Sequence, residues 1–129
     1  MLDRILSLIA EKLSLIGTNY FASENVNITS TNVNTLAHGA SITLPAGTYI
    51  IRAQAGFPTA SGSRNINIRL GPTDAEWAFQ RVVSADGLWA GLEATHIRTL
   101  TAQTTVYCSV SSSKTVNAVQ TKIEAVRIK

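Results

Sequence analysis

The chain has 129 residues, a net charge of +3 at pH 7, 45% hydrophobic residues and only 15% charged residues. This length fits one domain with its own core, and the abundance of threonine, serine and asparagine in place of charge is typical of β-sheet surfaces. The lysines and arginines are scattered and form no basic cluster with aromatic residues, which argues against nucleic-acid binding.

Residues 1–17 are predicted to form an N-terminal α-helix. Apolar residues recur there at helical spacing, and Gly17 stands where a helix would stop. Charged residues of both signs interrupt the run, which argues against a signal peptide, a membrane span and a membrane-surface helix. Its heptad positions favour a bundle of more than two helices, and we expect an anchor or a trimer stalk. The heptad residues are Leu2, Leu6, Ile9, Leu13 and Ile16.

Residues 18–129 change to the pattern of β-strands. Short apolar and polar alternations are separated by turn signals such as Gly71-Pro72 and Asp86-Gly87. About eight strands and no second helix predict a mainly β protein, an antiparallel jelly-roll β-sandwich. The predicted strands lie within TNYFASENVNITSTNVNT, ASITL, residues 48–57, RNINIRL, EWAFQRVVS, LWAGLEATHIRTL, TTVYCSV and AVQTKIEAVRI.

Alternation predicts which side chains face the core. In residues 48–57 one face is apolar throughout, and the other is polar except for Ile50, which therefore needs a covering partner. Cys108 is the only cysteine, so no disulfide forms within the chain, and we expect it to be a small buried residue between Val106 and Val110. The inward residues are predicted to be Tyr49, Ile51, Ala53, Ala55 and Phe57, followed by Ile66, Ile68 and Leu70.

Four stretches give the chain a family resemblance. LPAGTYIIRAQAGF, RNINIRL, LTAQTTVYCSV and the terminal IEAVRI resemble the jelly roll of tumour necrosis factor and of complement globular heads. Gly47-Thr48-Tyr49 matches the Gly-Tyr strand of that superfamily with one residue inserted. Ala102-Gln103 stands where Gly-Asp is usual, so the later strand matches loosely.

The resemblance implies a homotrimer packed through one sheet. The candidate interface residues are Tyr49, Ile50, Phe79 and Tyr107, with Trp77 as a further candidate. The helix would continue the trimer axis as a stalk. The alternative is a monomer in which the helix folds back over one sheet, and either arrangement would bury the apolar stripe of a helix that is too short to be stable alone.

No catalytic, cofactor or metal site is expected. His38 and His96 lack neighbours at the spacing of metal ligands, and no phosphate-binding loop is present. Asp74 and Glu76 form a close acidic pair, which we interpret as surface residues at a strand entry rather than as an acid–base pair.

Loop residues are the expected contacts with a receptor or glycan, because loops carry function on a rigid scaffold. The candidates are Arg64, Asp86 and Trp89, within residues 59–64 and 86–89. An indole stacks on a sugar ring while polar neighbours bind the hydroxyls. The other interpretation places the tryptophans in the core or on the trimer axis.

The features together predict a non-enzymatic protein of a bacteriophage virion. It would fold in the host cytoplasm and reach the virion surface as a head fibre, decoration protein or tail-fibre tip. Its partners would be two further copies of itself, other virion proteins through the helix, and a host-surface glycan or receptor. The alternative is a secreted recognition or signalling ligand of the complement-head type.

Overall fold

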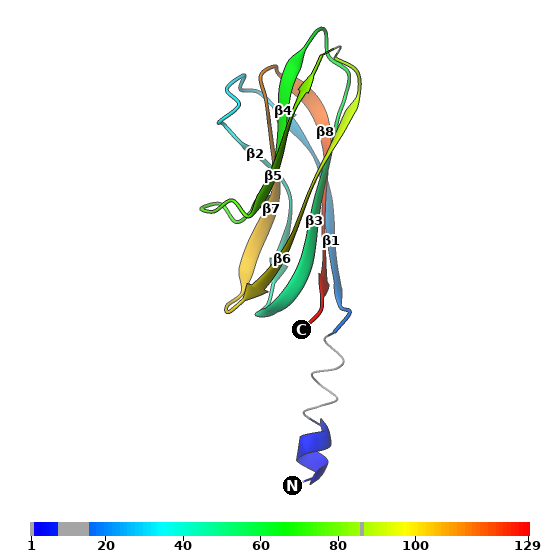
Figure 1. Cartoon of the computed structure of the whole chain (residues 1–129), viewed down its shortest axis with the longest axis vertical. Coiled ribbons are helices and arrows are strands. Elements are labelled where there is room, and N and C mark those ends of the chain that lie inside the picture. Colours follow the sequence, from blue (N-terminus) through cyan, green and yellow to red (C-terminus); the bar gives the residue numbers. More distant parts are fainter. Residues whose placement is uncertain (1, 8–15, 86) are drawn as a thin grey trace.

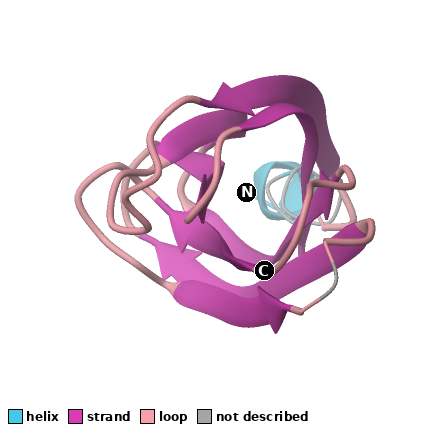
Figure 2. Ribbon diagram, turned by 90° about the horizontal axis from the view of Figure 1, so that it is seen from above, coloured by secondary structure: helices cyan, strands magenta, loops and turns pink. Residues whose placement is uncertain are grey.

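The computed structural model describes residues 2–7, 16–85 and 87–129. Within them, the chain is mainly β and forms a jelly-roll sandwich of two antiparallel four-stranded sheets (Figures 1 and 2), as predicted. The strands are β1 (Asn19–Ile28), β2 (Ala37–Leu44), β3 (Gly47–Phe57), β4 (Arg64–Gly71), β5 (Ala78–Ser84), β6 (Ala90–Leu100), β7 (Thr104–Ser112) and β8 (Val116–Arg127).

The strand order is that of a jelly roll. The first sheet has the order β1-β8-β3-β6, and the second sheet has the order β2-β7-β4-β5. Every connection except that between β4 and β5 crosses from one sheet to the other, so sequence neighbours face each other across the core. This crossing pattern distinguishes a jelly roll from a meander of hairpins.

The core lies between the two sheets and follows the predicted alternation. On β3, the side chains of Tyr49, Ile51, Ala53, Ala55 and Phe57 are all buried. On β4, those of Ile66, Ile68 and Leu70 are fully buried. The predicted inward faces of both strands are therefore confirmed.

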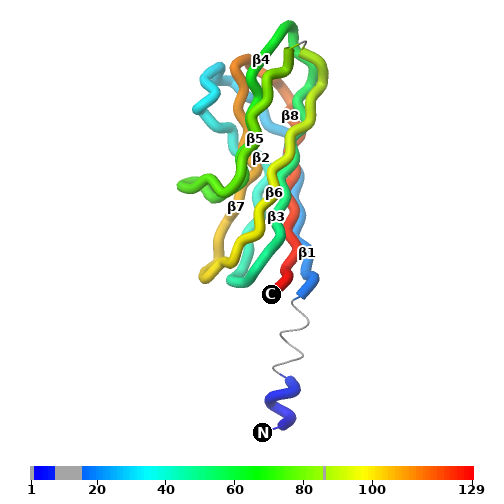
Figure 3. The backbone as a smooth tube through the Cα atoms, viewed as in Figure 1, coloured from blue at the N-terminus to red at the C-terminus, as the bar shows by residue number. Residues whose placement is uncertain are grey.

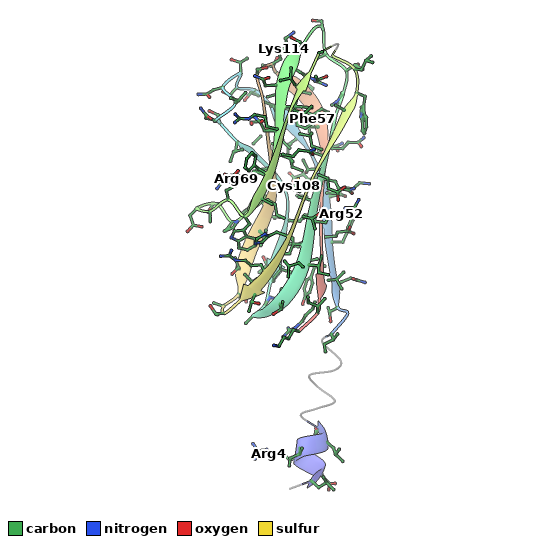
Figure 4. The ribbon with its side chains drawn as sticks, viewed as in Figure 1. Arg4, Arg52, Phe57, Arg69, Cys108 and Lys114 are labelled. Atoms are coloured by element: carbon green, nitrogen blue, oxygen red, sulfur yellow. The ribbon has the colours of Figure 1, made fainter. Side chains whose placement is uncertain are left out.

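Cys108 is buried in this core between the two sheets, as predicted (Figure 4). Its Sγ contacts the backbone oxygen of Gln54 at 3.5 Å, and burial raises the pKa of the thiol to about 12.

We expect Cys108 to be unreactive towards thiol reagents in the folded protein. An unfolded thiol ionises near pH 8.5, so at higher pH the unfolded state loses a proton that the folded state keeps. The free energy of unfolding should therefore be unaffected by this thiol below about pH 8.5 and fall by about 1.4 kcal/mol per pH unit as the pH rises towards 12. Urea unfolding measured from pH 7 to 11, with Cys108→Ala as the control that removes this part of the decline, tests the prediction. A thiol that reacts as fast in the native protein as in urea would contradict it.

The described part of the N-terminal helix does not cover a sheet. Residues 2–7 are helical and lie beyond the end of the sandwich at which β8 ends (Figures 1 and 3). Leu2 and Leu6 are both more than half exposed. Ile9 and Leu13 lie outside the described residues, whereas Ile16 is exposed in a turn before β1. No helix among the described residues is long and apolar enough to cross a membrane.

Candidate interaction surfaces on the first sheet

The outer face of the first sheet is built from side chains in register across the strands. β3 pairs with β6 on one side and with β8 on the other, which aligns outward residues of the three strands in rows. The rows change in character along β3. From its Phe57 end towards its Gly47 end, which is the end nearer the N-terminal helix, they change from glycine and polar residues to charged residues and then to apolar residues. The face therefore carries two different surfaces separated by charge.

The apolar surface lies towards the helix end. Ile50 pairs with Ile97 on β6 and with Val126 on β8, and all three side chains are exposed. Ile128, just after β8, is also exposed (41%), and so is Phe21 on β1 (64%), which pairs with Glu124 one row further along the sheet. We call these five residues the apolar patch. Exposed apolar side chains gathered in this way are typical of a surface that another molecule covers.

A row of charged residues borders the apolar patch. Arg52 on β3 forms ion pairs with Glu93 on β6 (2.9 Å) and with Glu124 on β8 (3.5 Å). Its side chain lies on the outside of the sandwich (Figure 4), and its hydrogen bond lowers the pKa of Glu93. Charged residues are depleted in the centre of protein interfaces, so this row marks an edge of the apolar patch.

The second surface is a groove beyond the charged row. It has a volume of about 450 Å³ and is lined by Gln54, Gln80, Trp89, Gln120 and Lys122, together with Glu93 of the charged row, over a floor that includes Gly56 and Gly91. Gly56 pairs with Gly91 across β3 and β6, and the indole of Trp89 lies against both. We call this the Trp89 groove.

Arg64 is not the exposed glycan contact that we expected. It is only 2% exposed, and its Nη2 donates hydrogen bonds to the backbone oxygens of Pro58 (2.6 Å) and Leu88 (3.3 Å). Burial lowers the pKa of its guanidinium. Arg64 therefore joins the loop after β3 to the loop before β6, and through Leu88 it holds the backbone next to Trp89.

Of the other two predicted contacts, Trp89 is exposed in the groove, and Asp86 lies outside the described residues.

The expected interface residues do not lie on one surface. Tyr49 is fully buried in the protomer's own core, where its hydroxyl donates to the backbone oxygen of Pro45, so it is withdrawn from the interface. Ile50 is exposed on the first sheet, whereas Phe79 and Tyr107 are on the outer face of the second sheet, where Tyr107 packs on His38. Trp77 is half-buried and stacks on His96.

Sequence reasoning missed Phe21, Ile97, Val126 and Ile128, although the outward position of Ile97 follows from the alternation of β6.

The described residues contain no cluster of three or more histidine, cysteine, aspartate or glutamate residues that could hold a metal ion. Asp74 and Glu76 lie between β4 and β5, whereas His38 contacts Ser109 and Tyr107, and His96 stacks on Trp77.

Comparisons with solved structures place this fold among known jelly rolls. It is similar to a chain of the infectious bursal disease virus Gx strain, with a TM-score of 0.54 and 9% identity over 88% of this chain and 32% of the viral chain. It is also similar to the globular domain of zebrafish complement 1qA protein, with a TM-score of 0.51 and 8% identity over 88% of this chain and 98% of that domain. Murine APRIL matches with a TM-score of 0.48 and 8% identity over 83% of this chain and 98% of its own.

The likenesses to the viral chain and to the complement domain show the fold. The chain spans about a third of the viral chain and almost all of the complement domain. No family model and no curated protein matches the sequence. The expected resemblance to complement heads is confirmed at the level of the jelly roll, and viral jelly rolls belong to the same set of neighbours.

Proposed function

We propose that this protein is a non-enzymatic structural and recognition protein of a bacteriophage virion, a homotrimer anchored to the particle by its N-terminal helix. Residues 18–129 would form the exposed jelly roll, and residues 1–17 the anchor or stalk. In this arrangement the jelly roll is a rigid carrier for contacts with the host surface.

The observation that carries the proposal is the apolar patch. Ile97, Ile50 and Val126 form an uninterrupted row across three strands, whereas most outward positions outside the apolar patch on this face are polar, charged or glycine. A second protein surface is the natural cover for such a patch, and closed symmetry gives a homotrimer three identical contacts of this kind.

The position of the helix supports the same arrangement. Residues 2–7 lie beyond the end of the sandwich where the apolar patch lies, and the backbone nitrogen of Gly17 donates a hydrogen bond to the backbone oxygen of Arg127 at 2.7 Å. Three chains that meet through the apolar patch would bring their helices together. Their exposed leucines would then be buried against each other or against the particle.

The viral and complement-like neighbours support a structural or recognition role more than an enzymatic one. A bacteriophage origin rests on the single cysteine and on the viral likeness of the fold. The alternative, a secreted complement-head-like ligand, would use the same trimer but would have no particle for the helix to bind.

Particle association is the test of this function. Phage particles assembled in cells that express the full chain should carry it through a density gradient, as measured by immunoblot. A chain of residues 17–129, which keeps the hydrogen bond between Gly17 and Arg127, should stay in the soluble fraction because it lacks the anchor. Absence of the full chain from the particles would contradict the virion role. Equal amounts of both chains on the particles would contradict the anchoring role of the helix.

A further inference from the structure

We propose that the Trp89 groove binds a neutral pyranose residue of a glycan, stacked on the exposed face of the Trp89 indole. This inference rests on the proposed recognition function and names its ligand class and its site. It does not depend on the trimer, because every residue used here comes from one chain.

The indole is presented as a flat binding surface. A Cβ atom on Gly56 would lie 2.8 Å from Cζ2 of Trp89, and one on Gly91 would lie 3.4 Å from Cη2. The two glycines therefore allow the ring to lie close to the sheet, while the residue remains 60% exposed. An indole that lies against two glycines and remains exposed offers apolar surface to the C–H side of a sugar ring.

The rim of the groove suits hydroxyl groups. Gln54, Gln80 and Gln120 bring amides that both donate and accept hydrogen bonds, and sugar hydroxyls do the same. Lys122 adds donors, and Glu93 belongs to the ion-pair group of Arg52 and Glu124, so two charges of each sign lie in or beside the groove. Because these four charges balance, the groove favours a neutral sugar over an anionic one.

The two residues before Trp89 are held in place before any ligand binds. The buried Arg64 donates to the backbone oxygen of Leu88, and the backbone nitrogen of Ala60 donates to that of Gly87 at 2.8 Å. Gly87 has a φ of 71°, and a Cβ atom there would lie 2.0 Å from the backbone oxygen of Ala60. A loop fixed in this way loses little conformational entropy on binding, which favours affinity.

The size and position of the groove agree with this ligand. Its volume of about 450 Å³ falls within the range of small-ligand sites. The ion pairs of Arg52 lie between the groove and the apolar patch, so a contact between protomers through the apolar patch would leave the groove open.

Titration of the full chain with neutral tetrasaccharides of glucose, galactose, mannose and N-acetylglucosamine tests the proposal. A tetrasaccharide of galacturonate serves as the anionic comparison. We expect calorimetry and saturation-transfer NMR to detect binding of at least one neutral sugar at concentrations up to about 10 mM. Tryptophan fluorescence in a Trp77→Phe background should report the same binding, because Trp89 is then the only indole.

Two substitutions at one position separate stacking from folding. Trp89→Ala should weaken binding at least about tenfold, whereas Trp89→Phe, which keeps an aromatic face, should retain part of the affinity. Light scattering should show the same mass for both variants and the unchanged chain. Three results would overturn the inference. They are no binding of any of the four neutral sugars, binding of galacturonate alone, and undiminished sugar binding by Trp89→Ala. Particle association with no sugar binding would overturn this inference alone and leave the proposed virion role intact.

Discussion

Replacing Ile50 by aspartate is expected to dissociate the proposed trimer into folded monomers. Ile50 lies at the centre of the row that joins Ile97, Ile50 and Val126. The carboxylate of an aspartate at this position would be enclosed by apolar side chains in the assembly. An uncompensated charge of this kind costs about 3–5 kcal/mol per protomer. In the monomer the same side chain is 41% exposed, so water can hydrate the carboxylate and the jelly roll should remain folded.

Light scattering across a dilution series, together with circular dichroism, measures both parts of this prediction. Ser41→Asp is the matched control, because Ser41 is exposed on the outer face of the second sheet. The chain of residues 17–129 should also be a trimer if the jelly roll associates through the apolar patch. A trimer that survives Ile50→Asp would contradict the assignment of the apolar patch, and a monomeric unchanged chain would contradict the trimer itself.

Phe79→Asp adds information on the geometry of the contact. Phe79 is exposed on the edge strand β5 of the second sheet, away from the apolar patch. If only Ile50→Asp dissociates the assembly, the apolar patches meet one another near the axis. If both variants dissociate it, the apolar patch of one protomer packs on the β5 edge of the next, which is a heterologous contact that closes into a ring.

Thr121→Val should markedly destabilise the folded protomer. Thr121 is 1% exposed, and its hydroxyl donates to the backbone oxygen of Glu24 (2.6 Å) and accepts from the backbone nitrogen of Ala40 (2.8 Å). Ala40 lies where the register between β2 and β7 shifts, so this hydroxyl joins the irregular part of the second sheet to the first. Valine has nearly the same shape but leaves both backbone groups without this partner. The expected cost is about 2–4 kcal/mol.

Urea unfolding at one fixed protein concentration tests this prediction, since association also contributes to stability. Thr121→Ser is the control, because it keeps the hydroxyl and removes only one methyl group, at a cost of about 1 kcal/mol. A valine variant as stable as the serine variant would show that the two hydrogen bonds contribute little.

The alternation of side chains made most of the fold predictable. Ile51 and Ile68 were assigned to the core from local sequence alone, and both are buried, because neighbouring side chains on a strand point to opposite faces. The same rule separates Tyr49, which is buried, from Ile50, which is exposed. The assignment of both residues to one interface was wrong for that reason.

The surfaces were less predictable because they depend on register and on loops. Ile50, Ile97 and Val126 are far apart in the sequence, and only the pairing of β3 with β6 and β8 brings them into one row. Arg64 was expected to be a contact because it was assigned to a loop, and loops carry function on a rigid scaffold. It is instead the first residue of β4, on the inward face with Ile66, and it donates to the backbone oxygens of Pro58 and Leu88. Alternation gives its inward position, but no local pattern reveals these two partners.

The position of Lys129, just after β8, affects where foreign peptides can be attached to the protein. The backbone of Lys129 bonds to Thr48 at the base of β3, next to the end from which the helix extends (Figure 3). A fusion appended after Lys129 would therefore crowd the anchor and the proposed subunit contact. Residues 58–63 connect β3 to β4 at the opposite end (Figure 1), so in the proposed arrangement an epitope inserted there would face away from the particle. For display purposes, this loop is a better insertion point than the C-terminus.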